Sequence, residues 1–232
     1  MTAPREPGTI DPLTVYEAFD TLSPKDQETY MSLSASEVQT NHALACMDDD
    51  LDEEIRNQVA RIGSIFESNA FNIGDEDEET GIVQAGIFPI AARFNHDCCP
   101  NVAQTWNENL KCLTIHAIRH IEEGEELCDS YVPLCQPSAL RKEELRAYGF
   151  DCACSVCGSK KFEDLQKSDK QRAMIHRLGE DLNFFARRRR GSWLGPISPS
   201  LDKSGQDDPL NVLRYLEHLL QEEGLVGHDL VQ

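Results

Sequence analysis

The segment from Phe94 to Asn101, Phe-Asn-His-Asp-Cys-Cys-Pro-Asn, concentrates reactive and ligating side chains in a few residues. It places an amide, an imidazole and two thiols directly after the apolar run from Gly86 to Ala92. A buried segment carries so many polar groups only if each has a partner. One interpretation is a strand that ends in a capped turn, where Asn95 and His96 satisfy local backbone groups. The other is a functional site, and two later stretches favour it.

These stretches are Gly124-Glu-Glu-Leu-Cys-Asp-Ser-Tyr131 and Cys152-Ala-Cys-Ser-Val-Cys157. Three closely spaced thiols are typical of a structural zinc site, which takes four ligands, so one ligand must come from elsewhere. The competing interpretation is three unpaired thiols in an exposed loop. With nine cysteines and no export signal, a reducing compartment is favoured over a disulfide framework.

Taken in order, the three stretches resemble the SET-domain protein lysine methyltransferases, most closely the SMYD-like subgroup. The family pattern Asn-His-Ser-Cys-x-Pro-Asn is present with Asp97 in the serine position, and both Gly-Glu-Glu-Leu-x-x-x-Tyr and the post-SET Cys-x-Cys-x-x-Cys are intact. The resemblance covers about residues 64–158. It implies an α+β fold, with a β-rich SET core of short sheets, a helical insert, a post-SET zinc loop and a helical C-terminal tail.

The resemblance also implies two cofactors. Structural Zn²⁺ is expected to be bound by four thiolates: Cys98, Cys152, Cys154 and Cys157. S-adenosylmethionine is expected to contact four residues, in part through backbone groups: Asn69, Asn95, His96 and Phe150. Cys99 could in principle replace Cys98 as a ligand, but its side chain is expected to point away from that of Cys98. The charge of Asp97 is expected to face solvent or a cation.

Methyl transfer from a sulfonium to an amine is an in-line displacement, so it needs alignment and a deprotonated amine but no covalent intermediate. By resemblance, Tyr131 and Tyr148 are the catalytic residues, with the Tyr131 hydroxyl at the transfer point. Tyr148 and Phe150 are expected to line a narrow channel that strips water from the substrate ammonium and thereby lowers its pKa. Simple packing of a helix end onto a sheet is the alternative role for Tyr148 and Phe150.

Composition restricts the partners. A net charge of −19 over 232 residues opposes direct binding to nucleic acid or a membrane surface and suits a basic protein partner. The chain has no apolar stretch of membrane-spanning length and no apolar signal at its start. We therefore expect an intracellular protein, nuclear or cytoplasmic, whose partner is a lysine-bearing protein substrate, histone or non-histone. The Arg187–Arg190 run is open to three interpretations: a nuclear signal, a contact for an acidic partner, or a basic helix end.

The expected organisation follows chain order: a disordered N-terminus 1–12, a helical SET insert 13–66, a SET core 67–135, a post-SET zinc segment 136–158 and a helical C-terminal extension 159–232. Capping and spacing signals predict helices over Pro24–Leu33, 160–190 and Leu210–Glu223. They also predict a helix with an apolar face from Leu51 to Phe66 that includes Ile55. A further helix is predicted from Pro137, with Leu140, Leu145 and Tyr148 on one face.

Alternation of apolar and polar residues predicts strands over Ser68–Ile73 and Gly81–Phe88, joined by an exposed acidic loop at 75–79. It also predicts a hairpin of 102–106 with 110–118, and a short strand that ends at Tyr131. The remaining cysteines are expected to be ordinary buried residues: Cys46, Cys112, Cys128 and Cys135.

The sequence therefore predicts an S-adenosylmethionine-dependent protein lysine N-methyltransferase. No Gly-x-Gly segment precedes the insert and no MYND zinc module is present, so the alternative is a truncated or impaired SET remnant that acts as a zinc-stapled protein-interaction module. A third interpretation, a zinc-dependent nucleic-acid binder, rests on the post-SET cysteines and the arginine run, and the net charge opposes it.

Overall fold

The computed structural model describes residues 11–47, 51–73, 84–158, 161–189 and 209–225. The chain divides into two compact units, each assembled from separate stretches of sequence. The first unit comprises Met1–Phe94, Gln104–Ile115 and Glu144–Asp151; the second comprises Asn95–Ala103, His116–Glu143 and Cys152–Gln232. The expectations for 1–10 and for the acidic loop at 75–79 lie outside the described residues.

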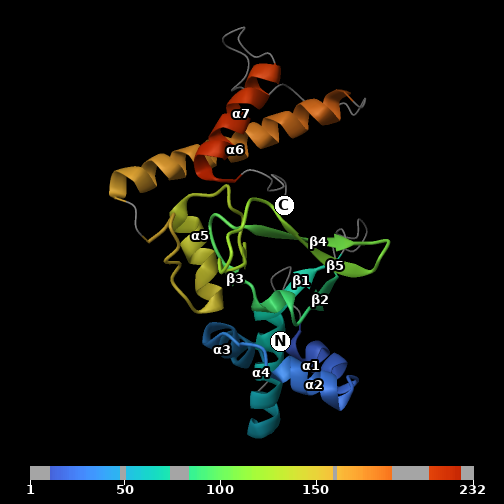
Figure 1. Ribbon diagram of the computed structural model, residues 1–232. Helices are drawn as coiled ribbons and strands as arrows, with labels where there is room; N and C mark the ends of the chain where they lie inside the picture. The colour runs from blue at the N-terminus through green and yellow to red at the C-terminus, as the bar shows by residue number, and fades with distance from the viewer. Residues whose placement is uncertain (1–10, 48–50, 74–83, 159–160, 190–208, 226–232) are drawn as a thin grey trace. The chain divides into compact units, whose positions relative to one another are not determined.

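Helices form most of the first unit: α1 Pro12–Asp20, α2 Pro24–Met31, α3 Glu37–Cys46 and α4 Glu53–Asn69 (Figure 1). In α1 and α2 a side-chain oxygen, from Asp11 or Ser23, accepts a backbone N–H of the first turn, and a proline follows the cap. The predicted helix after Ser23 is thus confirmed. Sequence reasoning missed α1, whose cap lies in a Pro/Gly-rich segment, and α3, whose Ser36 cap makes no side-chain hydrogen bond.

Helix α4 supplies the centre of this core. Its fully buried residues Ile62 and Ile65 pack with Val15 of α1 and with Tyr30 at the end of α2, whose hydroxyl donates to the Ile62 carbonyl at 2.7 Å. Each such aliphatic side chain contributes roughly 1.5–3 kcal/mol when it is removed from water. The predicted apolar face is confirmed at Ile62, but it is wrong at Ile55, which is 47% exposed near the start of the helix.

The strands of the first unit are short. β1 Ala70–Asn72 pairs antiparallel with β2 Ala85–Ile87, and β4 Val102–Asn107 pairs with β5 Cys112–Ala117 in the predicted hairpin. The chain turns between β4 and β5 with Lys111 at a φ of 50°, one residue later than expected. Phe88 joins these pairs, because its ring lies 6.1 Å from the Phe71 ring and 6.0 Å from the Trp106 ring, centroid to centroid.

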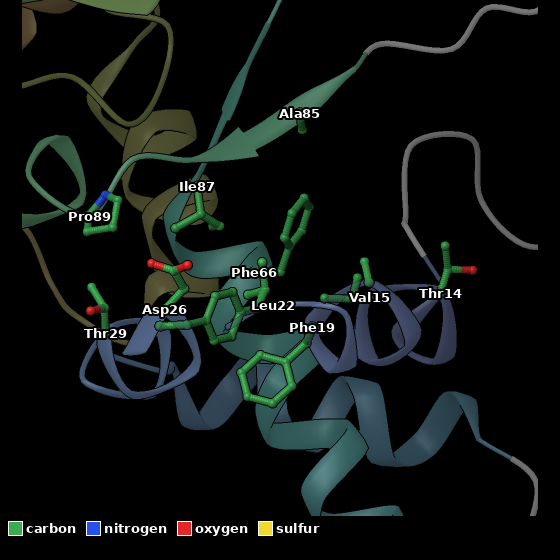
Figure 2. A pocket seen from close by; sticks show the side chains of 12 residues that line it. Thr14, Val15, Phe19, Leu22, Asp26, Thr29, Phe66, Ala85, Ile87 and Pro89 are labelled. Carbon is green, nitrogen blue, oxygen red and sulfur yellow. The ribbon is translucent and has the colours of Figure 1, made fainter. Parts of the chain in front are cut away.

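Between the helices and β2, the first unit holds an apolar pocket of about 550 Å³. Figure 2 shows Val15 and Phe19 of α1 facing it from one side and Ile87 and Pro89 from the other. None of the residues that the sequence assigns to chemistry lines this pocket. The pocket is therefore separate from the predicted site.

The second unit contains the parallel pair of β3 Asn95–His96 with β6 Cys128–Asp129 and the helices α6 Phe162–Arg189 and α7 Pro209–Glu223, which pack against each other (Figure 1). Helix α5 Ser138–Leu145 starts in this unit and continues into a short 3₁₀ turn, Arg146–Tyr148. The expected face of α5 is wrong at Leu140, which is 49% exposed, and confirmed at Leu145, which is fully buried.

Mixed helices, short two-stranded sheets, a cysteine cluster and a helical C-terminal tail together confirm the α+β fold class. Among the described residues, no helix has the length and apolar character needed to cross a membrane.

Candidate functional site

The two motifs singled out in the sequence meet in the β3–β6 pair. Asn95 lies opposite Cys128 and His96 opposite Asp129 in parallel register. The Asp97 N–H extends the ladder by donating to the Asp129 carbonyl at 3.0 Å. Segments that are far apart in the chain are thus held side by side by backbone hydrogen bonds, which fix their register.

The Asn101 side chain connects the same two motifs by further hydrogen bonds. Its side chain is almost fully buried, accepts the Cys128 N–H at 2.9 Å and donates to the Glu126 carbonyl at 2.7 Å. It also donates to the Glu125 carboxylate at 3.0 Å. A buried amide with its hydrogen-bonding groups satisfied in this way specifies one arrangement of the backbone. Sequence reasoning treated Asn101 only as part of a Pro-Asn turn, and its position at the end of the motif was the available signal.

His96 connects the strand pair to Tyr131. The Tyr131 N–H donates to His96 Nδ1 at 3.1 Å, and the two rings lie 5.6 Å apart, centroid to centroid. Burial lowers the pKa of His96 to about 4, so the imidazole is neutral near pH 7. Because Nδ1 accepts, the ring proton is on Nε2, which lies 3.3 Å from Cys98 Sγ. The imidazole therefore bridges the Tyr131 backbone and a cysteine of the predicted zinc site.

The structure brings together the four cysteines named as zinc ligands: Cys98, Cys152, Cys154 and Cys157. Their sulfur atoms all lie within 4.8 Å of one another. Cys98 Sγ is 3.9 Å from the sulfur of Cys152 and 3.6 Å from that of Cys157. A tetrahedron of bonds about 2.3 Å long has edges of about 3.8 Å. The donor set and its spacing therefore fit Zn²⁺.

The protonation of this cluster supports the same interpretation. Hydrogen bonds to Cys154 and Cys157, together with burial, raise the pKa of Cys98, and burial raises that of Cys152 to about 12. The pKa of Cys154 is lowered, because the thiols of Cys157 and Cys98 donate to it. These opposite shifts describe protons shared between neighbouring sulfurs. Four thiolates can coexist in so small a space only around a cation.

A buried arginine completes the cysteine centre. Arg141 is 0% exposed; its Nε donates to Cys98 Sγ at 3.3 Å and its Nη2 to Cys157 Sγ at 3.8 Å. Sequence reasoning did not name Arg141. The usable signal was its spacing of four residues from Leu145, which places both residues on the buried face of α5.

The neighbours of Cys98 differ in part from expectation. Cys99 faces away from the cluster, as predicted, with its sulfur 3.3 Å from the Gly224 carbonyl. The Asp97 side chain faces neither open solvent nor only a cation. It is half-buried, and its carboxylate accepts the Cys99 N–H at 2.7 Å. Burial raises the pKa of this carboxyl. The expectation that Cys46 is buried is wrong: that cysteine is the last residue of α3 and is exposed, with its sulfur 3.8 Å from His42 Nε2.

The other predicted site residues belong to the first unit. Asn69 is buried at the end of α4, and its Nδ2 donates at 2.7 Å to both the Ser34 and Ile65 carbonyls. This amide group therefore has a role in the fold. Tyr148 is half-buried, and burial raises its pKa, so the phenol is neutral near pH 7. Phe150 is 37% exposed just after the 3₁₀ turn. Asn95, by contrast, lies in the second unit, where it donates to the Glu126 carboxylate at 2.5 Å.

Part of the chain is similar to known proteins. The chain is 40% identical over 111 residues to histone-lysine N-methyltransferase set5 of Schizosaccharomyces pombe, which covers 47% of this chain and 33% of that protein. It is 37% identical over 113 residues to N-lysine methyltransferase SMYD2 of Homo sapiens, which covers 48% of this chain and 24% of that protein. It is 30% identical over 151 residues to SMYD2-B of Xenopus laevis, which covers 57% of this chain and 34% of that protein.

Residues 15–132 match the SET domain, and this match takes in more than half of the chain. The protein therefore belongs to the SET domain family. The aligned part spans a quarter to a third of the length of the relatives named above. Its β3–β6 pair and the segment up to Tyr131 fall inside the SET match, whereas the last three cysteines lie beyond it.

Proposed function

We propose that the protein is an S-adenosylmethionine-dependent protein lysine N-methyltransferase with one structural Zn²⁺. The observation that carries this proposal is the β3–β6 pair, which holds Asn95 and His96 beside the segment that ends at Tyr131, in a chain of the SET domain family. The relatives that match about half of this chain are named as lysine methyltransferases, which supports the same reaction.

In this proposal the zinc is bound by Cys98, Cys152, Cys154 and Cys157. Its role is structural, because four protein ligands leave no open position for substrate. The metal would connect the post-SET segment to Cys98, two residues after the Asn95–His96 strand. Arg141 and the His96 Nε2–H donate to the sulfur of Cys98 and so favour its thiolate form.

S-adenosylmethionine supplies a methyl group on a positively charged sulfur. Asn95 and His96 contact it in part through backbone groups, together with Asn69 and Phe150. The Tyr131 hydroxyl orients the lysine amine toward that methyl group. The backbone of Tyr131 is already fixed by His96 Nδ1, so little reorganisation is needed when substrate binds. Tyr148 and Phe150 form the channel that keeps the lysine amine dry and deprotonated.

The substrate is proposed to be a lysine in a basic segment of another protein. The net charge of −19 favours a positively charged partner and raises its encounter rate at low salt. Such a partner is a histone or another lysine-rich protein. The same charge disfavours direct contact with nucleic acid.

The experiment is a calorimetric titration of the zinc-loaded chain with S-adenosylmethionine, followed by transfer of a labelled methyl group to core histones and to a lysine-rich non-histone protein. Stoichiometric cofactor binding and label on lysine are the expected results. A folded, zinc-loaded chain that binds no cofactor and transfers no label would contradict the enzyme and leave the protein-interaction module as the function.

A further inference from the structure

We propose that two buried arginines, Arg141 and Arg172, are positioning residues for the segment Tyr131–Gln136. Arg141 connects this segment to the cysteine centre, and Arg172 connects it to the end of α7. The structural part of this inference stands on the contacts alone, whereas its catalytic consequence rests on the proposed function.

Arg141 faces both the metal ligands and the backbone. Two of its nitrogens donate to Cys98 and Cys157, and the third donates to the Gln136 carbonyl. The negative charge that pairs with the Arg141 guanidinium is therefore carried by the sulfur atoms of Cys98 and Cys157. Four thiolates around one Zn²⁺ leave a net negative charge, and a fully buried cation offsets it where water cannot.

Arg172 makes the matching connection from the C-terminal helices. It is also 0% exposed; its Nε donates to the Glu223 carboxylate at 2.8 Å and its Nη1 to the Leu134 carbonyl at 2.9 Å. Ser168 donates to the same Glu223 oxygen at 2.6 Å. Glu223 is the last residue of α7, and the following Gly224 has a φ of 69° that allows the chain to turn against Cys99.

The segment between these arginines is fixed at three places. Its first N–H, from Tyr131, donates to His96, and its Leu134 and Gln136 carbonyls accept from Arg172 and Arg141. A guanidinium can hold a carbonyl and an anion at the same time because its donors point in fixed directions, whereas a lysine ammonium cannot span the same groups. The cysteine centre and α7 thereby both set the path of the backbone that leaves Tyr131.

Cys135 is a built-in reporter of this arrangement, since it lies between the two accepting carbonyls and is half-buried. Its rate of alkylation by iodoacetamide, followed by mass spectrometry, measures how often the segment opens. The alkylation rate of exposed Cys46 is the reference for reagent reactivity, and that of half-buried Cys112 on β5 reports general unfolding. Saturating zinc protects the four cluster cysteines.

Burial raises the pKa of Cys135, and the charges of Arg172 and Arg141 partly oppose this rise. Lysine replacements keep these charges, so they test the positioning role separately from the reactivity of the thiol. We expect Arg141→Lys and Arg172→Lys each to raise Cys135 alkylation about ten-fold or more, the effect of losing a charge-assisted hydrogen bond, with Cys112 unchanged. Matched controls are the exposed arginines Arg146→Lys and Arg177→Lys, which leave Cys135 unchanged. Wild-type alkylation of Cys135 in both test variants overturns the positioning role.

Zinc affinity separates the two arginines. We expect Arg141→Met to lower it about 10–100-fold, Arg141→Lys to keep most of it, and Arg172→Lys to leave it unchanged. The readouts are competition with a chelator and the sulfur-to-metal charge-transfer bands of the Co²⁺-loaded chain. Wild-type affinity and bands in Arg141→Met would overturn the connection to the metal. If Arg141→Met does not fold, the shift of the Co²⁺ bands in Arg141→Lys decides the same point.

For methyl transfer, both lysine variants are expected to lower kcat with KM little changed, since they displace Tyr131 rather than the substrate-binding surface. A wild-type chain with no transferase activity contradicts the proposed function, yet the alkylation and zinc results still decide the positioning role. An active enzyme with unchanged kcat in both variants contradicts the catalytic consequence.

Discussion

At the scale of single residues, His96 has a polar neighbour at each of its two ring nitrogens. One ring nitrogen accepts the Tyr131 N–H while the other faces Cys98 Sγ. Both functions need the neutral imidazole, and burial supplies it by lowering the pKa of His96 to about 4. A single side chain thus couples the predicted catalytic tyrosine to the cysteine centre.

Replacing Tyr131 by phenylalanine tests the catalytic assignment. Tyr131→Phe keeps the ring beside His96 and the backbone hydrogen bond, so the thermal midpoint should change little. The methylation rate should fall by about 10²–10³, because the lost hydroxyl acts on the transition state. Labelled methyl transfer and thermal melting are measured in parallel, with Tyr16→Phe as a control outside the site. Equal activity in Tyr131→Phe and wild type would contradict the catalytic role of Tyr131.

The two neighbouring cysteines provide a matched test of the metal site. Cys98→Ala removes a ligand and should lower zinc affinity by more than the roughly 10–100-fold that loss of an outer partner costs. Cys99→Ala should keep one zinc per chain, because Cys99 faces Gly224 instead. Metal analysis after gel filtration measures both. Stoichiometric zinc at wild-type affinity in Cys98→Ala refutes the ligand assignment.

At the scale of elements, an ion pair and hydrogen bonds to one carboxylate stabilise the turn before β6. The Glu125 carboxylate pairs with Arg119 at 2.6 Å and accepts the Glu122 N–H and the Asn101 amide, and these contacts, Arg119 first, lower its pKa to about 2. A depressed carboxyl pKa stabilises the fold above the ordinary value of 4.5, and this contribution is lost as the pH falls from 4.5 through 2.

Arg119→Gln removes the largest cause of this shift. The Glu125 carboxyl should then titrate closer to 4.5, and acid unfolding should depend less on pH between 4.5 and 2. Carboxyl chemical shifts followed by NMR report the titration directly, and Arg146→Gln serves as the control. An unmoved Glu125 titration in Arg119→Gln would show that the Glu122 N–H and the Asn101 amide depress the pKa without Arg119.

The elements also show what sequence reasoning can and cannot find. The helix at Ser23-Pro24, the β4–β5 hairpin and the three post-SET cysteines were predictable, because caps, alternation and ligand spacing are local signals. Cys98 was expected only from the resemblance to the SET family, since it lies 54 residues before Cys152. The burial of Arg141 was not, because the thiolates that accept its N–H groups come from distant parts of the chain. Ile55 and Leu140 were misplaced for a related reason: helical spacing does not say which turn of a helix lacks a covering neighbour.

At the scale of the whole molecule, the buried Arg172–Glu223 pair joins α6 to α7. Removing one partner leaves an uncompensated buried charge, so Arg172→Met or Glu223→Leu should each cost about 3–5 kcal/mol of unfolding free energy. The double variant should cost clearly less than the sum, because both charges are gone. Urea unfolding of the zinc-loaded chain measures the cycle.

The exposed pair His176–Glu180 on α6 is the matched control, and Glu180→Gln should change stability by less than about 1 kcal/mol. Strict additivity of the Arg172 and Glu223 variants would contradict the coupling. It would mean that α7 is held by apolar contacts such as those of Leu216 and Leu219 rather than by the ion pair.

The wide separation of the metal ligands also has a consequence for synthesis. Cys98 and Cys152 are 54 residues apart in the chain. Because a ribosome adds about 5–20 residues per second, the Cys98 thiol exists for about 3–11 s before Cys152 is made. Residues Cys128–Asp129 emerge within that interval, so β3 can acquire its strand partner before the last three ligands arrive. We therefore expect the nascent strand pair to form before the proposed zinc site closes.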